Sequence, residues 1–503
     1  MKKRIICSVI LVLLIAFSMF SVSYGSSGNG TTIEEYEKMT AETLMKTICD
    51  ISRETNNINA LIDPSVVLES KITSKDKDSL TTLIKSDSTN EMAKYALIEI
   101  SGYLGEDEEL TAIYNSYLND TAKPDSLRQL CVWMLEENNT LLNKLKSIIE
   151  QENGGVAGQA LKRLYEMDRE YAIEKSREIV FNDKLIDTSL STEAIRRIGI
   201  NISKFNKKDR ELIKERLFSL LDTTQDEEQA LALFYAIAEN SDIIEQSKLL
   251  EYDMIDDETK FSWFNANEED QLSVLKQDPS VEQVTAISKI AEYSDSEEVK
   301  EILEKRGNLT DRASAKANQT YQHRGYAVYN DGNWYNIDYH AGLLLYNKTD
   351  TNKCVLHKYT TDNKVKLTTW SVFMGNTDFK CLCRPKGSLA TFESKINNIV
   401  SYGNQLRNQS IVYVLGKQIV YTSNPDGTTY YKPSDITKIR CDGVVEYCYE
   451  RNGLKVYAPA SDTSKWNVSK ISNNAYGHGG ISVTPQVQCL LCLNTVTTNE
   501  GSV

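Results

Sequence analysis

Six apolar, helix-like segments recur along the first two thirds of the chain, and this recurrence constrains the fold more than any other feature. Each combines small and large apolar residues at helical spacing, and an amphipathic stretch such as EELTAIYNSYLND follows as a second helix. The segments begin at Met92, Leu127, Val156, Thr192, Glu228 and Val281. One helix pair cannot bury its apolar face alone, whereas stacked pairs can, so the pattern predicts an all-α solenoid within residues 26–305.

The repeated pattern resembles degenerate HEAT-like repeats over about 220 residues. That resemblance implies a concave binding surface and no catalytic chemistry of its own. Helix starts are predicted at the capping residues Asp125-Ser126, Ser191 and Asp278-Pro279-Ser280.

The N-terminus predicts export. The basic MKKR precedes an apolar run from Ile5 to Phe20, and small residues follow at Ser23 and Gly25. This is the pattern of a signal peptide over residues 1–25, and the apolar run is shorter than the roughly 20 residues that span a bilayer. We therefore expect a secreted, cell-wall-associated mature chain without a membrane span after signal removal.

Charge divides the chain into two unlike parts. The whole chain carries −14; residues 318–503 hold 19 lysines and arginines against 13 acids, which is +6, and the signal adds +3, so residues 26–317 carry −23. Unlike surfaces indicate different roles. We expect the acidic helical region either to bind a protein partner or to pack against its basic neighbour and cover a site there. Nucleic acid is not an expected partner, because the basic residues are scattered along the chain.

The composition changes at residues 306–322, which we interpret as a polar linker. Beyond it, short runs rich in Tyr, Val and Thr, among them VKLTTWSVFM from Val365, alternate with Asn, Asp and Gly turns, which predicts strands and hairpins. Helices are predicted near residues 391–407 and 441–451. Residues 323–503 are therefore expected to form an α+β domain.

Ten cysteines, nine of them after signal removal, leave several interpretations open. Cys49 and Cys131 are expected in the helical core. CLC at 381–383 and CLLC at 489–492 are compatible with a four-thiolate zinc site, with disulfides or with plain thiols. We predict no metal and no cofactor. The state of six thiols stays open, namely Cys354, Cys381, Cys383, Cys448, Cys489 and Cys492.

The stretch KIRCDGVVEYCYERNGL predicts a helix that begins near Cys441 and stops at Asn452-Gly453. A thiol at a helix N-terminus meets the positive end of the backbone dipole, which favours the nucleophilic thiolate. The alternative is a small buried core residue. Asp442 is expected to act as a helix N-terminal charge.

All four histidines fall in the C-terminal part. His340 opens the segment HAGLLLYN, and His357 ends the returning segment CVLHK. In an antiparallel hairpin the two imidazoles lie near the same end, so His357 can orient His340 towards a cysteine. A purely structural pair is the alternative. His478 is a second candidate base, and His323, in the polar stretch from Arg306 to Tyr326, is expected to be solvated.

These segments together resemble the NlpC-like branch of the papain-like amidases, over about 130 residues. HAGLLLYN…CVLHK is similar to the histidine strand and the strand after it, and RCDGVVEYCYERNGL is similar to the nucleophile helix. His340 precedes Cys441, which reverses the usual order and resembles the circularly permuted group. The resemblance implies that Cys441 is the nucleophile, His340 the general base and then acid, and His357 the orienting residue.

The implied function is a cysteine amidase or peptidase that hydrolyses amide bonds of cell-wall peptidoglycan peptides through an acyl-enzyme. Two other classes remain open. One is an acyltransferase or thioesterase of the same permuted fold, and the other is a noncatalytic exported scaffold with a degenerate hydrolase domain.

Overall fold

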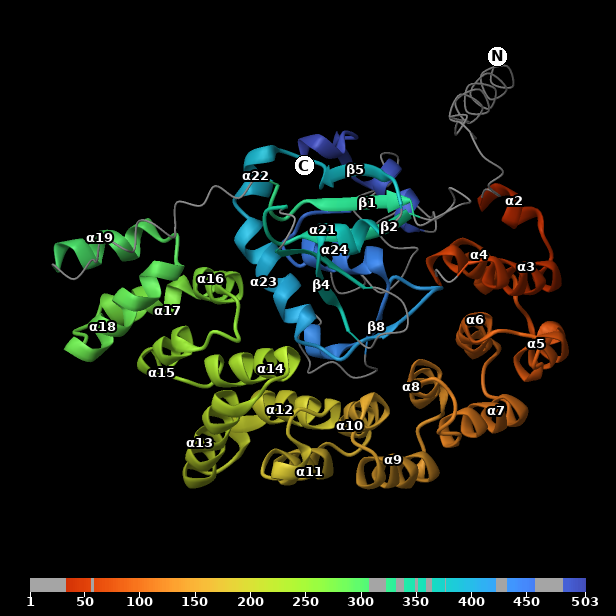
Figure 1. Cartoon of the computed structure of the whole chain (residues 1–503), viewed down its shortest axis with the longest axis horizontal. Coiled ribbons are helices and arrows are strands. Elements are labelled where there is room, and N and C mark those ends of the chain that lie inside the picture. Colours follow the sequence, from red (N-terminus) through yellow and green to blue (C-terminus); the bar gives the residue numbers. More distant parts are fainter. Residues whose placement is uncertain are drawn as a thin grey trace, which may run out of the picture.

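The computed structural model describes residues 33–55, 58–306, 323–331, 339–348, 352–358, 364–375, 377–421, 432–456 and 483–503. The predicted signal peptide, nearly all of the predicted linker and His478 lie outside these residues. The described residues up to Lys305 contain helices and no strand, whereas the described strands lie between Ala327 and Thr497. The chain is thus a helical region followed by an α+β region (Figure 1). Among the described helices, none is both long enough and apolar enough to cross a membrane.

The helical region is a curved double layer (Figure 1). Helices α6, α8, α10, α12 and α14 contact one another in sequence, and α7, α9, α11 and α13 pack against them from outside. The helices are α2 Ile33–Lys38, α3 Ala41–Glu54, α4 Ile62–Lys71, α5 Lys77–Lys85, α6 Glu91–Ser101, α7 Glu108–Asn119, α8 Asp125–Met134, α9 Asn139–Gln151, α10 Gly155–Met167, α11 Arg169–Val180, α12 Ser189–Asn201, α13 Lys207–Thr223, α14 Glu227–Ala238, α15 Ile243–Lys248, α16 Asp257–Ala266, α17 Glu268–Leu275, α18 Val281–Ile290 and α19 Glu297–Lys305.

The six recurring sequence segments are helices α6, α8, α10, α12, α14 and α18, so the periodicity identified mainly the inner row. Cys49 and Cys131 are buried, as expected. Of the predicted caps, Ser280 is correct, since its side chain accepts from the Gln283 backbone N–H. Ser191 is wrong: the Thr188 hydroxyl caps α12 and accepts from the Ser191 N–H. Asp125 is the first residue of α8, and no side-chain cap precedes it.

The C-terminal region contains a six-stranded antiparallel sheet in the order β4-β3-β2-β1-β5-β9 and a small sheet in the order β6-β8-β7. In the small sheet β6 runs parallel to β8 and β7 antiparallel to it. The strands are β1 Ala327–Asp331, β2 Tyr339–Leu344, β3 Lys353–His357, β4 Lys366–Thr369, β5 Phe379–Arg384, β6 Val412–Tyr413, β7 Ile419–Tyr421, β8 Ile436–Ile439 and β9 Asn494–Thr497.

Two helices of this region match the predicted ones. The helix expected near residues 391–407 is interrupted, with α22 followed by α23, and the cysteine helix is α24. Gly453 ends the turn after α24 with a φ of +72°, a conformation that favours glycine. The helices are α21 Trp370–Met374, α22 Leu389–Glu393, α23 Ile396–Arg407, α24 Cys441–Glu450 and α25 Pro485–Val487, which continues into a π-helix over Gln488–Cys492.

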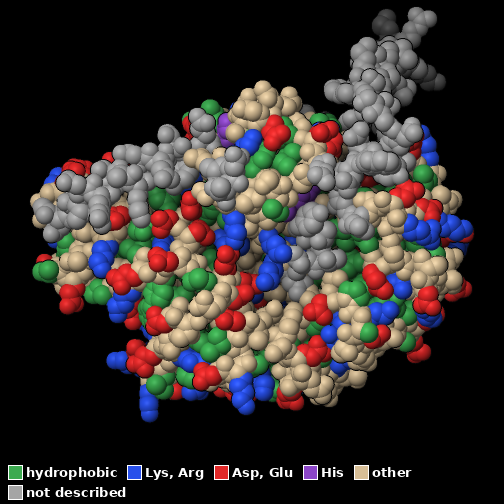
Figure 2. Space-filling model, viewed as in Figure 1, with side chains coloured by type: hydrophobic (Ala, Val, Ile, Leu, Met, Phe, Trp, Pro, Cys, Tyr) green, Lys and Arg blue, Asp and Glu red, His purple; other side chains and the backbone are tan. Residues whose placement is uncertain are grey.

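The inner face of the curved helical layer is occupied by the C-terminal region (Figure 1). The Glu99 carboxylate accepts from the backbone N–H groups of Leu415 and Gly416, and the Lys162 ammonium donates to two backbone carbonyls. Both side chains are buried. The concave surface that the repeats predict therefore holds part of the same chain. On the face seen in Figure 2, acidic and basic side chains are interspersed over the helical layer.

Substituting Lys162 tests this contact. Its Nζ donates to the Ser410 carbonyl at 2.5 Å and to the Ile436 carbonyl at 2.6 Å. Lys162→Met leaves two buried carbonyls without these donors, so we expect it to lower the free energy of unfolding by about 2–4 kcal/mol in urea titration. Lys208→Met, at an exposed position, is the matched control and should stay within about 0.5 kcal/mol. Equal effects of the two substitutions would contradict the contact.

Candidate functional site

Cys441 is the first residue of α24. Strand β8 ends at Ile439, Arg440 is the N-cap residue, and the helix packs against β2. The Cys441 side chain is 0% exposed, and the backbone N–H of Ala341, on β2, is a hydrogen-bonding neighbour of its sulfur. The sulfur thus lies at a helix N-terminus beside the strand that carries His340.

The hairpin brings His340 and His357 together. The His340 Nε2 lies 2.7 Å from the His357 Nδ1, and the His357 Nε2 lies 2.9 Å from the Thr368 hydroxyl on β4. The ring of Phe373, from α21, packs against both imidazoles, with centroid separations of 5.4 and 5.3 Å. The two histidines form a hydrogen-bonded pair with fixed ring planes.

The second ring nitrogen of His340, Nδ1, is hydrogen-bonded to a residue of the helical region. Asn59, in the 3₁₀ turn Ile58–Leu61 before α4, places its Nδ2 2.9 Å from the His340 Nδ1. The Tyr413 hydroxyl donates to the Asn59 Oδ1 and is also a hydrogen-bonding neighbour of the Cys441 sulfur. A polar chain therefore runs from Cys441 through Tyr413 and Asn59 to His340 and His357. When the Asn59 amide donates, the His340 Nδ1 is an acceptor and its ring proton sits on Nε2.

Burial keeps the thiol and the imidazoles neutral. It raises the pKa of Cys441 to about 12, and the neighbouring Asp442 charge acts in the same direction, whereas the Ala341 N–H and Arg440 oppose it. Burial also lowers the pKa of His340 to about 3 and that of His357 well below its usual value. A helix N-terminus alone favours thiolate, but here desolvation outweighs it. In this arrangement Cys441 is a thiol.

Arg440 and Asp442, on either side of Cys441, form a buried ion pair. The Arg440 Nε lies 2.6 Å from the Asp442 Oδ1, Nη2 lies 2.9 Å from Oδ2, and both side chains are 0% exposed. The remaining guanidinium donors reach the carbonyls of Leu415 and Val483, and Gln418 donates to Asp442. Asp442 does more than place a charge at a helix start, because it also holds the side chain of Arg440, the residue before Cys441.

The Asp63 carboxyl is a second polar group of the helical region, and it lies near the ion pair of Arg440 and Asp442. Asp63 lies on α4, is buried, and its Oδ2 has no hydrogen-bond partner among the residues that the structure describes. Burial raises the pKa of Asp63 to about 7, although the charge of Arg440 and a hydrogen bond with Thr484 act against the rise. Residues 58–71 thus deliver two polar side chains, Asn59 and Asp63, to the surroundings of Cys441.

Sequence reasoning missed Asn59, Tyr413 and Thr368. The local sequence could have identified Thr368, because it follows the hairpin in the next predicted strand, where a polar side chain can reach His357. The local sequence could not have identified Asn59, since it lies 281 residues before its partner His340. Tyr413 sits in an apolar strand in which a tyrosine is typical core.

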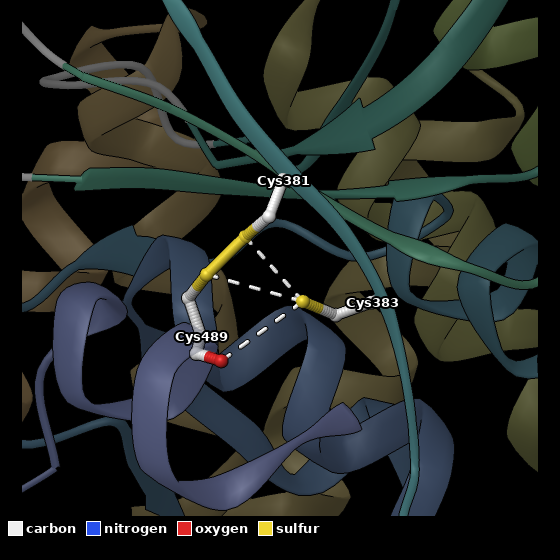
Figure 3. A group of neighbouring side chains, drawn as sticks. All are labelled: Cys381, Cys383 and Cys489. Atoms are coloured by element: carbon white, nitrogen blue, oxygen red, sulfur yellow. Dashed lines mark hydrogen bonds between the residues drawn. A yellow bond between two sulfur atoms is a disulfide. The ribbon is translucent and has the colours of Figure 1, made fainter. Parts of the chain in front are cut away.

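The remaining candidates lie apart from this chain of contacts. His323 packs against the ring of Tyr326. Cys354, Cys448 and Cys492 are buried thiols, while Cys381 and Cys489 form a disulfide with Cys383 beside it (Figure 3). Cys492 does not join that group, so the four-thiolate arrangement of CLC and CLLC is absent from the described residues.

Two clefts lie between the helical and C-terminal regions, with volumes of about 400 and 450 Å³. The first is lined by residues that include Trp263, Tyr402 and Arg451, and the second by residues that include Glu228 and Lys364. Neither is lined by Cys441, His340 or His357. The thiol therefore lies outside both of these clefts.

Comparisons with protein-family models, with curated proteins and with solved structures find no match.

The raised pKa of Asp63 predicts a pH-dependent stability. In the unfolded chain the carboxyl loses its proton near pH 4, whereas in the folded chain it keeps it until about pH 7, so its contribution to stability falls as the pH rises through this window. Asp63→Asn should remove that loss and raise the free energy of unfolding by about 2–4 kcal/mol at pH 8, with little difference near pH 4.

Urea titration at the two pH values measures this difference. Asp125→Asn, at an exposed position, should change stability by less than about 0.5 kcal/mol at both. An Asp63→Asn variant that is no more stable than the parent at pH 8 would show that the buried carboxyl carries no such penalty.

Proposed function

We propose that this protein is an exported cysteine amidohydrolase in a closed state, with Cys441 as nucleophile, His340 as general base and then acid, and His357 as the orienting residue. The observation that carries the proposal is the pairing of a thiol at the first turn of α24 with a histidine pair on the adjoining strands. A permuted papain-like fold and a HEAT-like solenoid are the fold proposals that go with it.

The chemistry follows from these positions. With Asn59 withdrawn, the His340 Nδ1 takes the thiol proton, and His357 holds the ring through Nε2. The thiolate attacks an amide carbonyl, His340 protonates the leaving amine, and water activated at the same nitrogen hydrolyses the acyl-enzyme. The Cys441 backbone N–H at the helix start and the Tyr413 hydroxyl are the donors proposed for the oxyanion.

The closed state explains the burial of the thiol. The Asn59 side chain occupies the nitrogen that catalysis needs, and the Cys441 thiol is held neutral. We propose that the helical region keeps the enzyme latent until residues 58–71 move. The proposed substrates are amide bonds of cell-wall peptidoglycan peptides, since export and the resemblance to NlpC-like amidases both point to them.

A noncatalytic scaffold is the second candidate, favoured by the same burial. A thiol that is fully buried, whose pKa is raised to about 12 and which lines neither of the two clefts, is not a nucleophile in this arrangement. The acyltransferase or thioesterase alternative uses the same three residues and differs only in the substrate.

Hydrolysis of purified peptidoglycan stem peptides, followed by mass spectrometry, tests the proposal. We expect slow turnover by the mature protein and faster turnover by Asn59→Ala. In the Asn59→Ala background, Cys441→Ala should abolish turnover and His340→Ala should lower kcat by about 10²–10⁴-fold. Cys448→Ala, a buried thiol on the same helix, is the matched control and should retain activity.

If the Asn59→Ala variant turns over no stem peptide but binds one tightly, that result would favour the scaffold. Turnover of activated esters but not of amides would favour the acyltransferase or thioesterase.

A further inference from the structure

Three buried sulfurs converge at a place that the proposed reaction does not use. Cys381 and Cys383 lie two residues apart on β5, so their side chains share one face of the strand, and Cys489 lies on the π-helix over Gln488–Cys492. The Cys383 Sγ is 3.4 Å from the Cys381 Sγ and 3.9 Å from the Cys489 Sγ (Figure 3). We call these three residues the sulfur cluster.

The two sulfur separations that involve Cys383 fit ligands of one ion, and the third pair, Cys381 and Cys489, is bonded as a disulfide in this structure. Metal–sulfur bonds of about 2.3 Å place two thiolates of one centre roughly 4 Å apart. All three ligand atoms lie within 4.8 Å of one another, and all three residues are buried. The Cα atoms of Cys381 and Cys489 are 7.4 Å apart, wider than the roughly 4.4–6.8 Å that disulfides usually span. A metal bridging the sulfurs suits that separation better than a direct bond.

The donor set selects the kind of ion. Thiolate ligands favour copper(I), zinc and iron–sulfur centres, and structural zinc takes four ligands. The described residues bring three Cys ligands together here without a fourth Cys, His, Asp or Glu. Three buried sulfurs suit a three-coordinate soft ion such as copper(I), whereas structural zinc takes a fourth ligand.

We propose that Cys381, Cys383 and Cys489 form a copper(I) site in the reduced protein. The disulfide form must first be reduced: a phosphine takes oxygen from water, becomes the phosphine oxide and converts the Cys381–Cys489 disulfide into two thiols. One copper(I) then binds and releases protons from the thiols that coordinate it. The bound ion joins the π-helix to β5, as the disulfide does in the oxidised chain.

Copper(I) titration of the phosphine-reduced mature protein against a chromophoric copper(I) chelator tests the site. We expect one copper(I) per chain, at least tenfold weaker retention in Cys383→Ser, and unchanged retention in Cys492→Ser. Cys492 is a matched control, because it is a buried thiol on the same π-helix outside the sulfur cluster. Equal retention in the two variants, or none in the parent, would overturn the proposal.

X-ray absorption of the copper-loaded parent protein gives a readout that does not depend on how the variants fold. Three sulfur ligands support the site, whereas nitrogen or oxygen ligands, or two sulfurs, overturn it.

Discussion

The buried pair of Arg440 and Asp442 holds together the part of the molecule on which the proposed chemistry depends. An unpaired charge in a protein interior costs several kcal/mol, so the two groups must stay together, and the guanidinium must keep its carbonyl partners. Those partners come from the loop after β6 and from Val483. The pair therefore fixes the start of α24, and with it the position of Cys441, relative to these two segments.

The helical region closes over this framework. Asn59 reaches His340, Asp63 reaches the surroundings of Arg440, and Glu99 and Lys162 bind backbone of the C-terminal region. These contacts are polar and directional, and they lie on the inner face of the curved layer (Figure 1). The proposed release of residues 58–71 requires the contacts of Asn59 and Asp63 to break. The acidic helical region and the basic C-terminal region complement each other through pairs such as Asp256 with Arg407.

Local sequence patterns predicted the helices and strands but not the contacts between residues that lie far apart in the chain. Helical periodicity identified the inner helices, and the hairpin with His340 and His357 followed from alternation and turn residues. The strand expected through VKLTTWSVFM instead ends at Thr369, because the Thr369 hydroxyl caps α21 and accepts from the Val372 N–H. α21 then carries Phe373 onto both imidazoles. Asn59 lay beyond prediction, since nothing in its own neighbourhood specifies a histidine 281 residues away.

The most direct test of the latent-enzyme account is the rate at which iodoacetamide alkylates Cys441, followed by peptide mass mapping between pH 6 and 9. Asn59→Ala removes the two hydrogen bonds described above, to His340 and Tyr413, of about 1 kcal/mol each, so the account predicts roughly 30-fold faster alkylation than in the parent. Ser65→Ala, at a buried polar position on the following helix α4, should leave the rate unchanged. In the opened variant, reactivity should persist well below the ordinary thiol pKa of about 8.5 and should be lost with His340→Ala. Equal alkylation rates in Asn59→Ala and the parent, or a pH profile of Asn59→Ala that His340→Ala does not change, would contradict the account.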